Sequence, residues 1–323
     1  MISIDDELHI PGIGLWMDAR RPRALCFISH AHSDHIAAHR RTIATKATAA
    51  LCRKRLKHRR ASDYEIRDFG ESFGCGDSTV TLFPAGHVLG SSQIVVRSGE
   101  STTAYTGDFK LRGGRTHELC QVPRCDTLIM ECTYGRPHYR FPQRAAVEAE
   151  LIARCSAALD QKITPVVYAY ALGKAQEVIA ALSEAGFKVA AVTEVADVCE
   201  VYESLGVHLG SYARYDARAD GRFVVVAPPA ARRSAEVDHL IPRYEIAVTG
   251  WAVDRAMRSR LGVDCALAWS DHADFDDLIS YVRQAAPKRV FCLHGFPDFV
   301  GYLKRAGIRA EWLAPSRQLQ LFR

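Results

Sequence analysis

The stretch Ser29-His30-Ala31-His32-Ser33-Asp34-His35 decides how this chain is interpreted. It places three imidazoles and one carboxylate within six residues, directly after the apolar run 24–28. Groups crowded in this way at the end of a buried strand lose hydration and repel one another as they gain protons, unless a divalent cation organises them. The stretch therefore predicts a dinuclear metal site, and with it an enzyme.

Length and composition set the frame for that site. The chain has 323 residues, more than a single domain usually holds, so we expect either two domains or one large domain with an insertion. Its formal charge is +5, with Lys and Arg concentrated in Arg40-Arg41 and in residues 53–60. A basic surface favours a polyanionic partner, although such a run is equally typical of a solvated helix face.

Cellular location is predicted from what the sequence lacks. We find neither a long apolar stretch nor a charged leader with an apolar core, so we expect a cytoplasmic protein with no membrane partner. Its ten cysteines show no C-x-x-C spacing. They are interpreted as free thiols in a reducing compartment.

The hydrophobic pattern divides the chain into three stretches of an α/β protein. Up to about residue 135 it predicts an antiparallel-rich sheet and a basic helix at 45–56, whereas 144–250 alternates helix and strand as a parallel α/β lobe does. The last stretch returns to strand 265–269, helix 274–286 and strand 289–293. The strands expected in the first stretch are 24–29, 79–83, 93–97, 102–106 and 127–131. The elements expected in the middle are helices 145–159 and 174–185 and strands 165–169, 188–192, 223–227 and 245–249.

Further metal donors follow apolar runs elsewhere. His87, Asp108 and His294 each come at the end of a strand-like segment and beside a glycine. Strand ends are rigid and glycine lets the backbone bend close to an ion, so donors from distant segments can converge. Taken singly, a histidine at such a position is more often structural. The 30–35 cluster is what favours a ligand role for all three.

Taken in order, these residues carry a family resemblance. His30-x-His32-x-Asp34-His35, then His87 and Asp108, resembles the ligand set of the metallo-β-lactamase superfamily. Glu131, His272 and His294 are similar to motifs A, B and C of its β-CASP nuclease branch, and 173–177 (GKAQE) resembles a helix start of the β-CASP cap. The resemblance implies an αββα sandwich formed by residues 1–143 and 251–323. A small α/β cap at 144–250 would be inserted into it.

The resemblance also implies roles for these residues. His30, His32 and His87 would hold one Zn²⁺ and Asp34, His35 and His294 the other, with Asp108 as the bridge; Mn²⁺ is the alternative metal. A hydroxide activated by the two metals would attack the scissile phosphate, with Asp34 orienting it. Glu131 and His272 would form the pair that protonates the leaving oxygen. The alternatives are a partner of a surface cation for Glu131 and a residue at a helix N-terminus for His272.

Four residues are weaker candidates for substrate binding. Ser91 and Ser92 follow His87 and offer hydroxyls to a phosphate, although Ser-rich turns are common. Lys174, at a predicted helix start, would receive a phosphate through its amine and the helix dipole. Arg136, after motif A, suits a phosphate or a base, and a surface loop is the simpler interpretation.

The function predicted from these features is a dinuclear-metal phosphodiesterase acting on nucleic acid. His294 at motif C is typical of the RNA-processing branch, yet the compact form resembles bacterial exonucleases associated with DNA ligase, as well as mRNA 3′-end-processing factors. We favour a DNA exonuclease of DNA repair, with DNA ligase or helicase as partners by resemblance. An RNA nuclease is the alternative. A small-molecule metallo-hydrolase and a non-catalytic zinc-binding scaffold are the more distant rivals.

Overall fold

The structure is a computed structural model that describes residues 3–4, 7–56, 63–217 and 222–313. Its chain contacts divide it into two units. The first unit consists of 1–113, 117–137 and 272–323, and the second of 114–116 and 138–271. The first unit therefore consists of three separate segments of the sequence. The main segment of the second unit, 138–271, comes in the sequence between the second and the third of these segments.

Two sheets make up most of the first unit. The first has the order β1-β2-β3-β4-β5-β6 and the second the order β19-β18-β11-β10-β9-β8-β7. Strands of the first sheet are β1 (Ser3–Ile4), β2 (Leu8–Ile10), β3 (Leu15–Met17), β4 (Leu25–Phe27), β5 (Arg41–Ala44) and β6 (Asp63–Ile66). Strands of the second are β7 (Ser72–Cys75), β8 (Ser78–Pro84), β9 (Ser92–Ser98), β10 (Ser101–Tyr105), β11 (Thr127–Cys132), β18 (Arg289–Gly295) and β19 (Ala310–Trp312). The unit also contains η1 (Pro11–Ile13), α1 (Lys46–Leu56), α6 (Phe275–Ala285) and α7 (Asp298–Arg305).

Strand pairing in this unit is mixed, and less antiparallel than the sequence predicts. Strands β7 to β10 pair antiparallel, but β11, β18 and β19 join them in parallel, and β3 to β6 are also parallel. Parallel neighbours need a long connection, which is usually a helix. Between β4 and β5 that connection is the irregular loop 28–40, which carries the histidine run. Because residues 28–40 show no helical pattern, the sequence predicts antiparallel pairing in this part of the chain.

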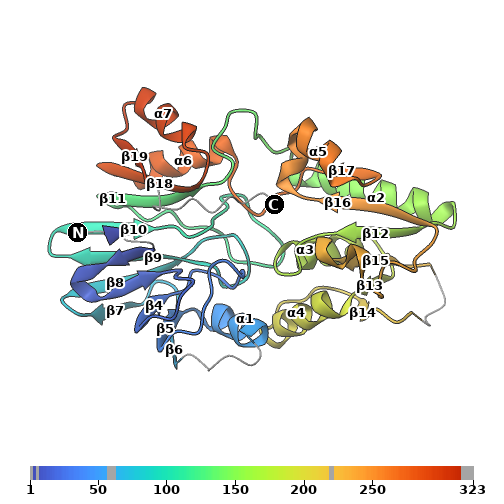
Figure 1. The fold of residues 1–323 in the computed structure, drawn as a ribbon, viewed down its shortest axis with the longest axis horizontal. Helices are drawn as coiled ribbons and strands as arrows, with labels where there is room; N and C mark the ends of the chain where they lie inside the picture. Colours follow the sequence, from blue (N-terminus) through green and yellow to red (C-terminus); the bar gives the residue numbers. More distant parts are fainter. Residues whose placement is uncertain (1–2, 5–6, 57–62, 218–221, 314–323) are drawn as a thin grey trace. The chain divides into compact units, whose positions relative to one another are not determined.

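The second sheet of this unit is covered on both faces. Leu128 and Met130 of β11 pack with residues of α6 and α7, whereas Ile129 packs with Phe27 and Ile43 of the other sheet. Figure 1 shows α6 and α7 on one side of β11 and β18, and strands β4 to β6 on the other. A strand buried on both faces is apolar throughout. A charged side chain at the end of such a strand is therefore a marked exception.

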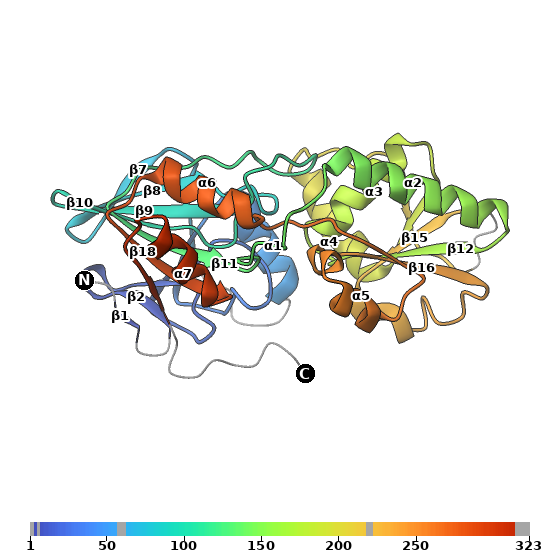
Figure 2. The same ribbon diagram turned by 90° about the horizontal axis from the view of Figure 1, so that it is seen from above.

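The second unit is a parallel α/β structure. Its single sheet has the order β14-β13-β15-β12-β16-β17, with every pair parallel. Its strands are β12 (Thr164–Tyr168), β13 (Val189–Ala191), β14 (Tyr212–Arg214), β15 (Val224–Ala227), β16 (Arg243–Val248) and β17 (Cys265–Leu267). Its helices are α2 (Arg144–Asp160), α3 (Lys174–Glu184), α4 (Thr193–Ser204), η2 (Pro229–Arg233), η3 (Gly250–Val253) and α5 (Arg255–Leu261). In Figure 2 helices flank this sheet on both sides.

The predicted α/β class is confirmed, and the elements expected from the sequence match helices and strands of the structure within a few residues. Helix α4 was not predicted, and Lys57–Arg60 of the basic run lie outside the described residues. All ten cysteines are free thiols, as expected. Among the described residues no helix is both long and apolar enough to cross a membrane.

Candidate metal centre

Three histidine rings converge in the first unit, on the loop after β4 and the loop after β8. His30 Nε2 lies 3.0 Å from His32 Nδ1, and His87 Nε2 lies 3.1 Å from the same atom. His30 and His87 are almost fully buried. One donor atom of each ring and one carboxylate oxygen of Asp108 all lie within 4.8 Å of one another. The structure thus brings together donors from three separate segments of the sequence.

The spacing of these nitrogen atoms fits a cation. Two ligand nitrogens at the usual Zn–N distance of a tetrahedral zinc site lie about 3.3 Å apart. The observed separations of 3.0 and 3.1 Å are close to that value. A neutral imidazole carries one N–H, so three ring nitrogens this close share few protons. A zinc ion at their centre would satisfy all three lone pairs.

A second group of donors shares Asp108. His35, Asp108 and His294 offer one atom each within 4.8 Å. Asp108 Oδ2 lies 3.4 Å from His35 Nε2, 3.5 Å from His30 Nε2 and 3.9 Å from His87 Nε2. His35 Nε2 is buried and has no hydrogen-bond partner among the described residues. Asp108 therefore faces both groups, as a bridging ligand would.

Asp34 is less closely associated with this second group. Its Oδ2 lies 3.8 Å from His35 Nε2, and its side chain is half exposed. Burial raises the pKa of Asp34, but the neighbouring His35 outweighs that effect and holds the pKa below its usual value. The carboxylate is therefore charged and accessible beside the donor group.

Electrostatics differ between the two groups. Burial, reinforced by His35 and His87, holds the pKa of His30 well below its usual value. Burial would also lower the pKa of His35, but Asp108 and Asp18 outweigh it and hold that pKa well above its usual value. Burial disfavours the charged form of Asp108, yet His35 outweighs it, so the Asp108 pKa lies well below its usual range. The site thus keeps Asp108 ionised and His30 neutral, which are the forms that bind a metal.

Sequence reasoning missed Asp18, which lies directly after β3. Its Oδ2 is 2.9 Å from His35 Nδ1 and accepts a hydrogen bond of 2.8 Å from the Tyr105 hydroxyl. The amide of Ser29 donates to its Oδ1 at 2.7 Å. A carboxylate on the far nitrogen of a metal-binding histidine fixes the ring's tautomer and orientation. The available signal was a lone acid at the end of an apolar strand.

Glu131 and His272 form a pair beside the donor groups. His272 Nδ1 lies 2.9 and 3.0 Å from the two carboxylate oxygens of Glu131. Glu131 is 1% exposed, and it also accepts hydrogen bonds from the Phe109 amide at 2.8 Å and from the Thr133 hydroxyl. One oxygen of Glu131 and one nitrogen of His272 lie within 4.8 Å of Asp108. The buried carboxylate thus holds the ring by its Nδ1 atom.

Glycine residues allow two of these strand ends to approach neighbouring segments of the chain closely. Gly107 precedes Asp108 at φ +54, and a Cβ there would lie 2.5 Å from Ser29 Cβ. Gly295 follows His294 at φ +124, and its Cβ would lie 2.0 Å from the Cys132 carbonyl oxygen. The register between β11 and β18 shifts at the same place, between Glu131 and Cys132. A side chain at either position would clash with Ser29 or with the Cys132 backbone, next to the donor groups.

The weaker substrate candidates all have partners within the protein. Ser91 Oγ accepts from the amides of His87 and Val88 at 3.0 and 3.2 Å, and Ser92 Oγ donates to the Ser29 carbonyl at 3.3 Å. Lys174, in the second unit, pairs with Asp271 at 2.6 Å. Arg136 pairs with Asp298 at 2.9 Å and lies over the Phe296 ring. A substrate role for these four residues stays a prediction.

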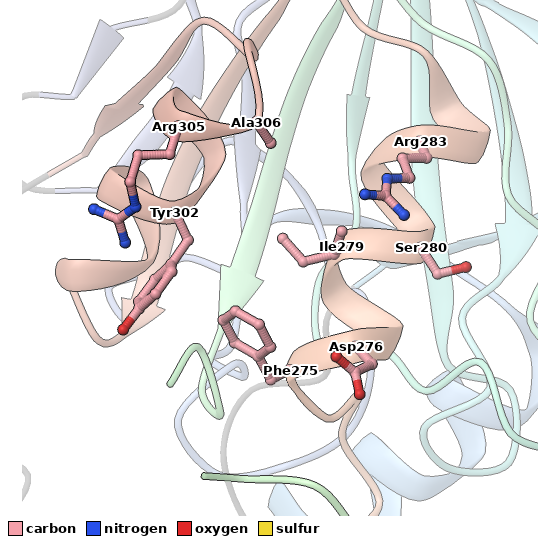
Figure 3. Close-up of a pocket in the computed structure, with 8 residues that line it drawn as sticks. All are labelled: Phe275, Asp276, Ile279, Ser280, Arg283, Tyr302, Arg305 and Ala306. Atoms are coloured by element: carbon pink, nitrogen blue, oxygen red, sulfur yellow. The ribbon is translucent and has the colours of Figure 1, made fainter. Parts of the chain in front are cut away.

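A groove in the first unit is separate from the donor groups. It lies between α6 and α7, has a volume of about 610 Å³, and is lined by eight residues, among them Phe275, Arg283, Tyr302 and Arg305. Figure 3 shows these side chains on the two helices. None of the predicted site residues lines it. The chemistry is therefore located by the converging donors and not by the size of the groove.

Comparison with known proteins agrees with the donor set. Residues 263–312, which include His272 and His294, match the family described as "Zn-dependent metallo-hydrolase RNA specificity domain". The chain is 38% identical over 323 residues, 99% of its length, to the "Probable DNA ligase" of Opitutus terrae, of which it covers 32%. It is 34% identical over 157 residues, 47% of its length, to the "Transcription termination factor FttA" of Methanothermobacter thermautotrophicus, of which it covers 24%. It is also 27% identical over 189 residues, 50% of its length, to the "RNase aCSPSF2" of Saccharolobus solfataricus, of which it covers 38%.

One solved structure shares the fold. It is a protein of unknown function from Enterococcus faecalis, with a TM-score of 0.58 and 16% identity, covering 91% of this chain and 80% of that one. The chain covers only 24% to 38% of the length of these three curated relatives. Its donor groups, its zinc-dependent family match and these relatives agree on one assignment. They support the β-CASP branch of the metallo-β-lactamase superfamily as the family of this chain.

Proposed function

We propose that this protein is a metal-dependent nuclease that hydrolyses phosphodiester bonds. The observation that carries the proposal is the shared position of Asp108. It belongs both to the two groups of metal donors and to the group formed with Glu131 and His272. Hydrolysis of a phosphodiester needs a nucleophile, neutralisation of phosphate charge and a proton for the leaving oxygen. This one cluster offers residues for all three.

In this proposal His30, His32, His87 and Asp108 hold one zinc ion. His35, His294 and Asp108 hold the other, with Asp34 beside them. When bound, such ions lower the pKa of coordinated water and offset the charge of a phosphate oxygen. Asp18 fixes the ring of His35 through its Nδ1 atom. Asp34, charged and half exposed, orients the attacking water.

Glu131 and His272 supply the proton. The Phe109 amide and the Thr133 hydroxyl hold the Glu131 carboxylate, so its two oxygens face His272 Nδ1. A carboxylate on one ring nitrogen stabilises the doubly protonated ring. His272 then holds a proton at Nε2 and donates it to the leaving oxygen, after which water returns the ring to its starting state.

The family's architecture gives the two units their roles in this proposal. The first unit, with helices and sheets in layers, is the αββα sandwich. The second, whose main segment is 138–271, is the β-CASP cap in this proposal; the family resemblance predicts the cap at 144–250.

We further propose that the substrate is DNA and that the enzyme acts in DNA repair in the cytoplasm. The match along 99% of the chain is to a relative named as a probable DNA ligase. A domain joined to a ligase encounters DNA ends, where an exonuclease would prepare them for sealing. RNA is the second candidate, because the matched family is described by RNA specificity and two relatives are named for transcription termination and RNA cleavage.

The test compares substrates of one sequence. The purified protein is incubated with end-labelled single- and double-stranded DNA and RNA in the presence of Zn²⁺ or Mn²⁺, beside an Asp108→Ala variant. Faster cleavage of DNA, with products shortened from one end, supports the full proposal, whereas faster cleavage of RNA selects the second candidate. If no oligonucleotide is cleaved, the nuclease proposal fails. Zinc binding without hydrolysis would indicate a scaffold, and turnover of lactone or thioester probes would indicate a small-molecule hydrolase.

A further inference from the structure

Lys174 occupies an unusual position at the start of helix α3. It is the first residue of the helix and only 2% exposed. A cation near a helix N-terminus is opposed by the helix dipole, and a buried ammonium loses its hydration. The helix start is already stabilised, because the Gln176 side chain accepts from the Gly173 amide at 2.7 Å and donates to the Ala171 carbonyl at 3.0 Å. Helix formation therefore does not explain this lysine.

Asp271 does explain it. Lys174 Nζ lies 2.6 Å from Asp271 Oδ1, and both residues belong to the second unit. Asp271 is 5% exposed, so the ion pair is buried on both sides. A buried pair of this kind contributes little net stability compared with apolar residues of similar volume, and its best-attested use is to specify one arrangement of the chain. The question is which arrangement it specifies.

Asp271 is the last residue of the second unit, and the next residue is His272 of the first unit. The following residues are anchored one after another. His272 binds Glu131 through Nδ1, the Ala273 amide donates to the Phe109 carbonyl at 2.8 Å, and Asp274 accepts from the Asp277 amide and pairs with Arg112. On the N-terminal side of His272, Lys174 holds Asp271 through the buried ion pair. The backbone on both sides of His272 is thus held by side-chain or backbone contacts.

We propose that Lys174 is a positioning residue for His272 and acts through Asp271. It fixes the peptide that enters His272, so that the ring meets Glu131 with its Nε2 atom directed consistently. The inference rests on the proposed function, in which His272 protonates the leaving oxygen. It assigns to Lys174 a role different from a direct phosphate contact, because its ammonium is buried and bound to Asp271.

The test uses two substrates that differ in one atom. The first is the oligonucleotide that the wild-type protein cleaves. The second carries sulfur in place of the leaving oxygen at the same linkage, made in 3′ and 5′ versions so that one contains the true leaving atom. A thiolate leaves without being protonated, whereas an alkoxide depends on the general acid. A defect in positioning His272 therefore affects the first substrate and spares the second.

Two variants separate positioning from stability. Lys174→Met leaves Asp271 buried without its cation and is expected to lower the melting temperature. Lys174→Met with Asp271→Leu removes both charges and keeps the volume, so the fold is expected to recover while the link is still absent. Lys188→Met is the matched control, because Lys188 is an exposed lysine of the same unit.

For the double variant we expect a melting temperature and zinc content close to those of the wild type. We expect kcat on the oxygen substrate to fall about tenfold or more with little change in KM, and turnover of the sulfur substrate to change less than about twofold. Equal losses on both substrates, or no loss on either, would overturn the proposal. If the wild-type protein cleaves neither substrate, the proposed nuclease function fails instead, which is a distinguishable result.

Discussion

The two units of this protein use the ends of their strands differently. In the first unit, the segments after β3, β4, β8 and β10 carry Asp18, the histidine run, His87 and Asp108, and His294 lies near the end of β18. In the second unit the strands are as deeply buried, but every group of metal donors found among the described residues lies in the first. Burial of a sheet therefore does not by itself make a site. In the first unit the loops after β3, β4, β8 and β10 are irregular and carry donors or their partners, whereas β12, β13, β15 and β16 of the second unit lead into helices.

The strongest test of this contrast removes the carboxylate that faces both donor groups. Asp108→Ala is expected to lower the zinc content of the purified protein from two ions towards none and to abolish cleavage, because both groups lose a shared ligand. Metal analysis and an oligonucleotide assay measure the two effects. Asp77→Ala, at an exposed aspartate of the same unit, is the control. A variant that keeps two metals and normal turnover would disprove the site.

The second test separates proton transfer from metal binding. His272→Ala is expected to retain the metal content and to cleave about a hundredfold more slowly, as loss of a general acid does. His208→Ala, at an exposed histidine of the second unit, should behave as the wild type. Wild-type rates in His272→Ala would exclude the proton-donor role, and loss of zinc would make His272 a ligand.

The third test concerns the carboxylate that orients His35. Asp18→Asn keeps the size of the side chain but removes its charge, and it is expected to weaken binding of one zinc ion by about ten- to a hundredfold. Binding of the other ion should change less, because Asp18 holds the ring of His35, whereas the rings of His30 and His87 gather around His32 Nδ1. A competition titration with a chromophoric chelator resolves the two affinities. Equal weakening of both would show that Asp18 supports the whole fold.

The smallest expected effect is a difference in pH dependence between the two donor groups. Asp108 and Asp18 hold the pKa of His35 above its usual value, so a cation there must displace a proton at neutral pH. The lowered pKa of His30 leaves that ring free of a proton to a lower pH. As pH falls from 8 to 6, affinity at the His35 group should drop first, by up to about tenfold per pH unit. Calorimetric titration with zinc at several pH values measures both affinities. If they fall equally steeply with pH, the predicted difference between the His35 group and the His30 group is wrong.

The residues of the site were easier to predict than their surroundings. Histidine, aspartate and glutamate at the ends of apolar runs are conspicuous in a sequence, because such runs otherwise end in turn residues. Asp18 was missed because its strand, Leu15–Met17, is only three residues long and gives no periodic signal. Lys174 was given a phosphate-binding role because its partner Asp271 is 97 residues away in sequence. Contacts of that range depend on the tertiary fold.

The same reasoning explains the partial success with the fold. Helix 274–286 was predicted with an Asp-rich start, and in the structure Asp274 caps the helix. The parallel pairing of β4 and β5 was not predicted, because the connection that normally reveals it, a helix, is replaced by the loop of the histidine run. The loop that carries the metal donors therefore also lacks the helical pattern that would have predicted parallel pairing.

The division of the first unit into three segments has a consequence for the newly made protein. The donors of the first group, His30 to Asp108, leave the ribosome early, but His272 and His294 follow only after the whole second unit has been made. At the usual rate of synthesis the interval between residues 108 and 294 lasts roughly ten to forty seconds. During that time the growing chain can hold a first cation yet lacks the donors that complete the second group and the proton donor. The proposed hydrolytic activity would therefore wait until the second unit and His294 have been made.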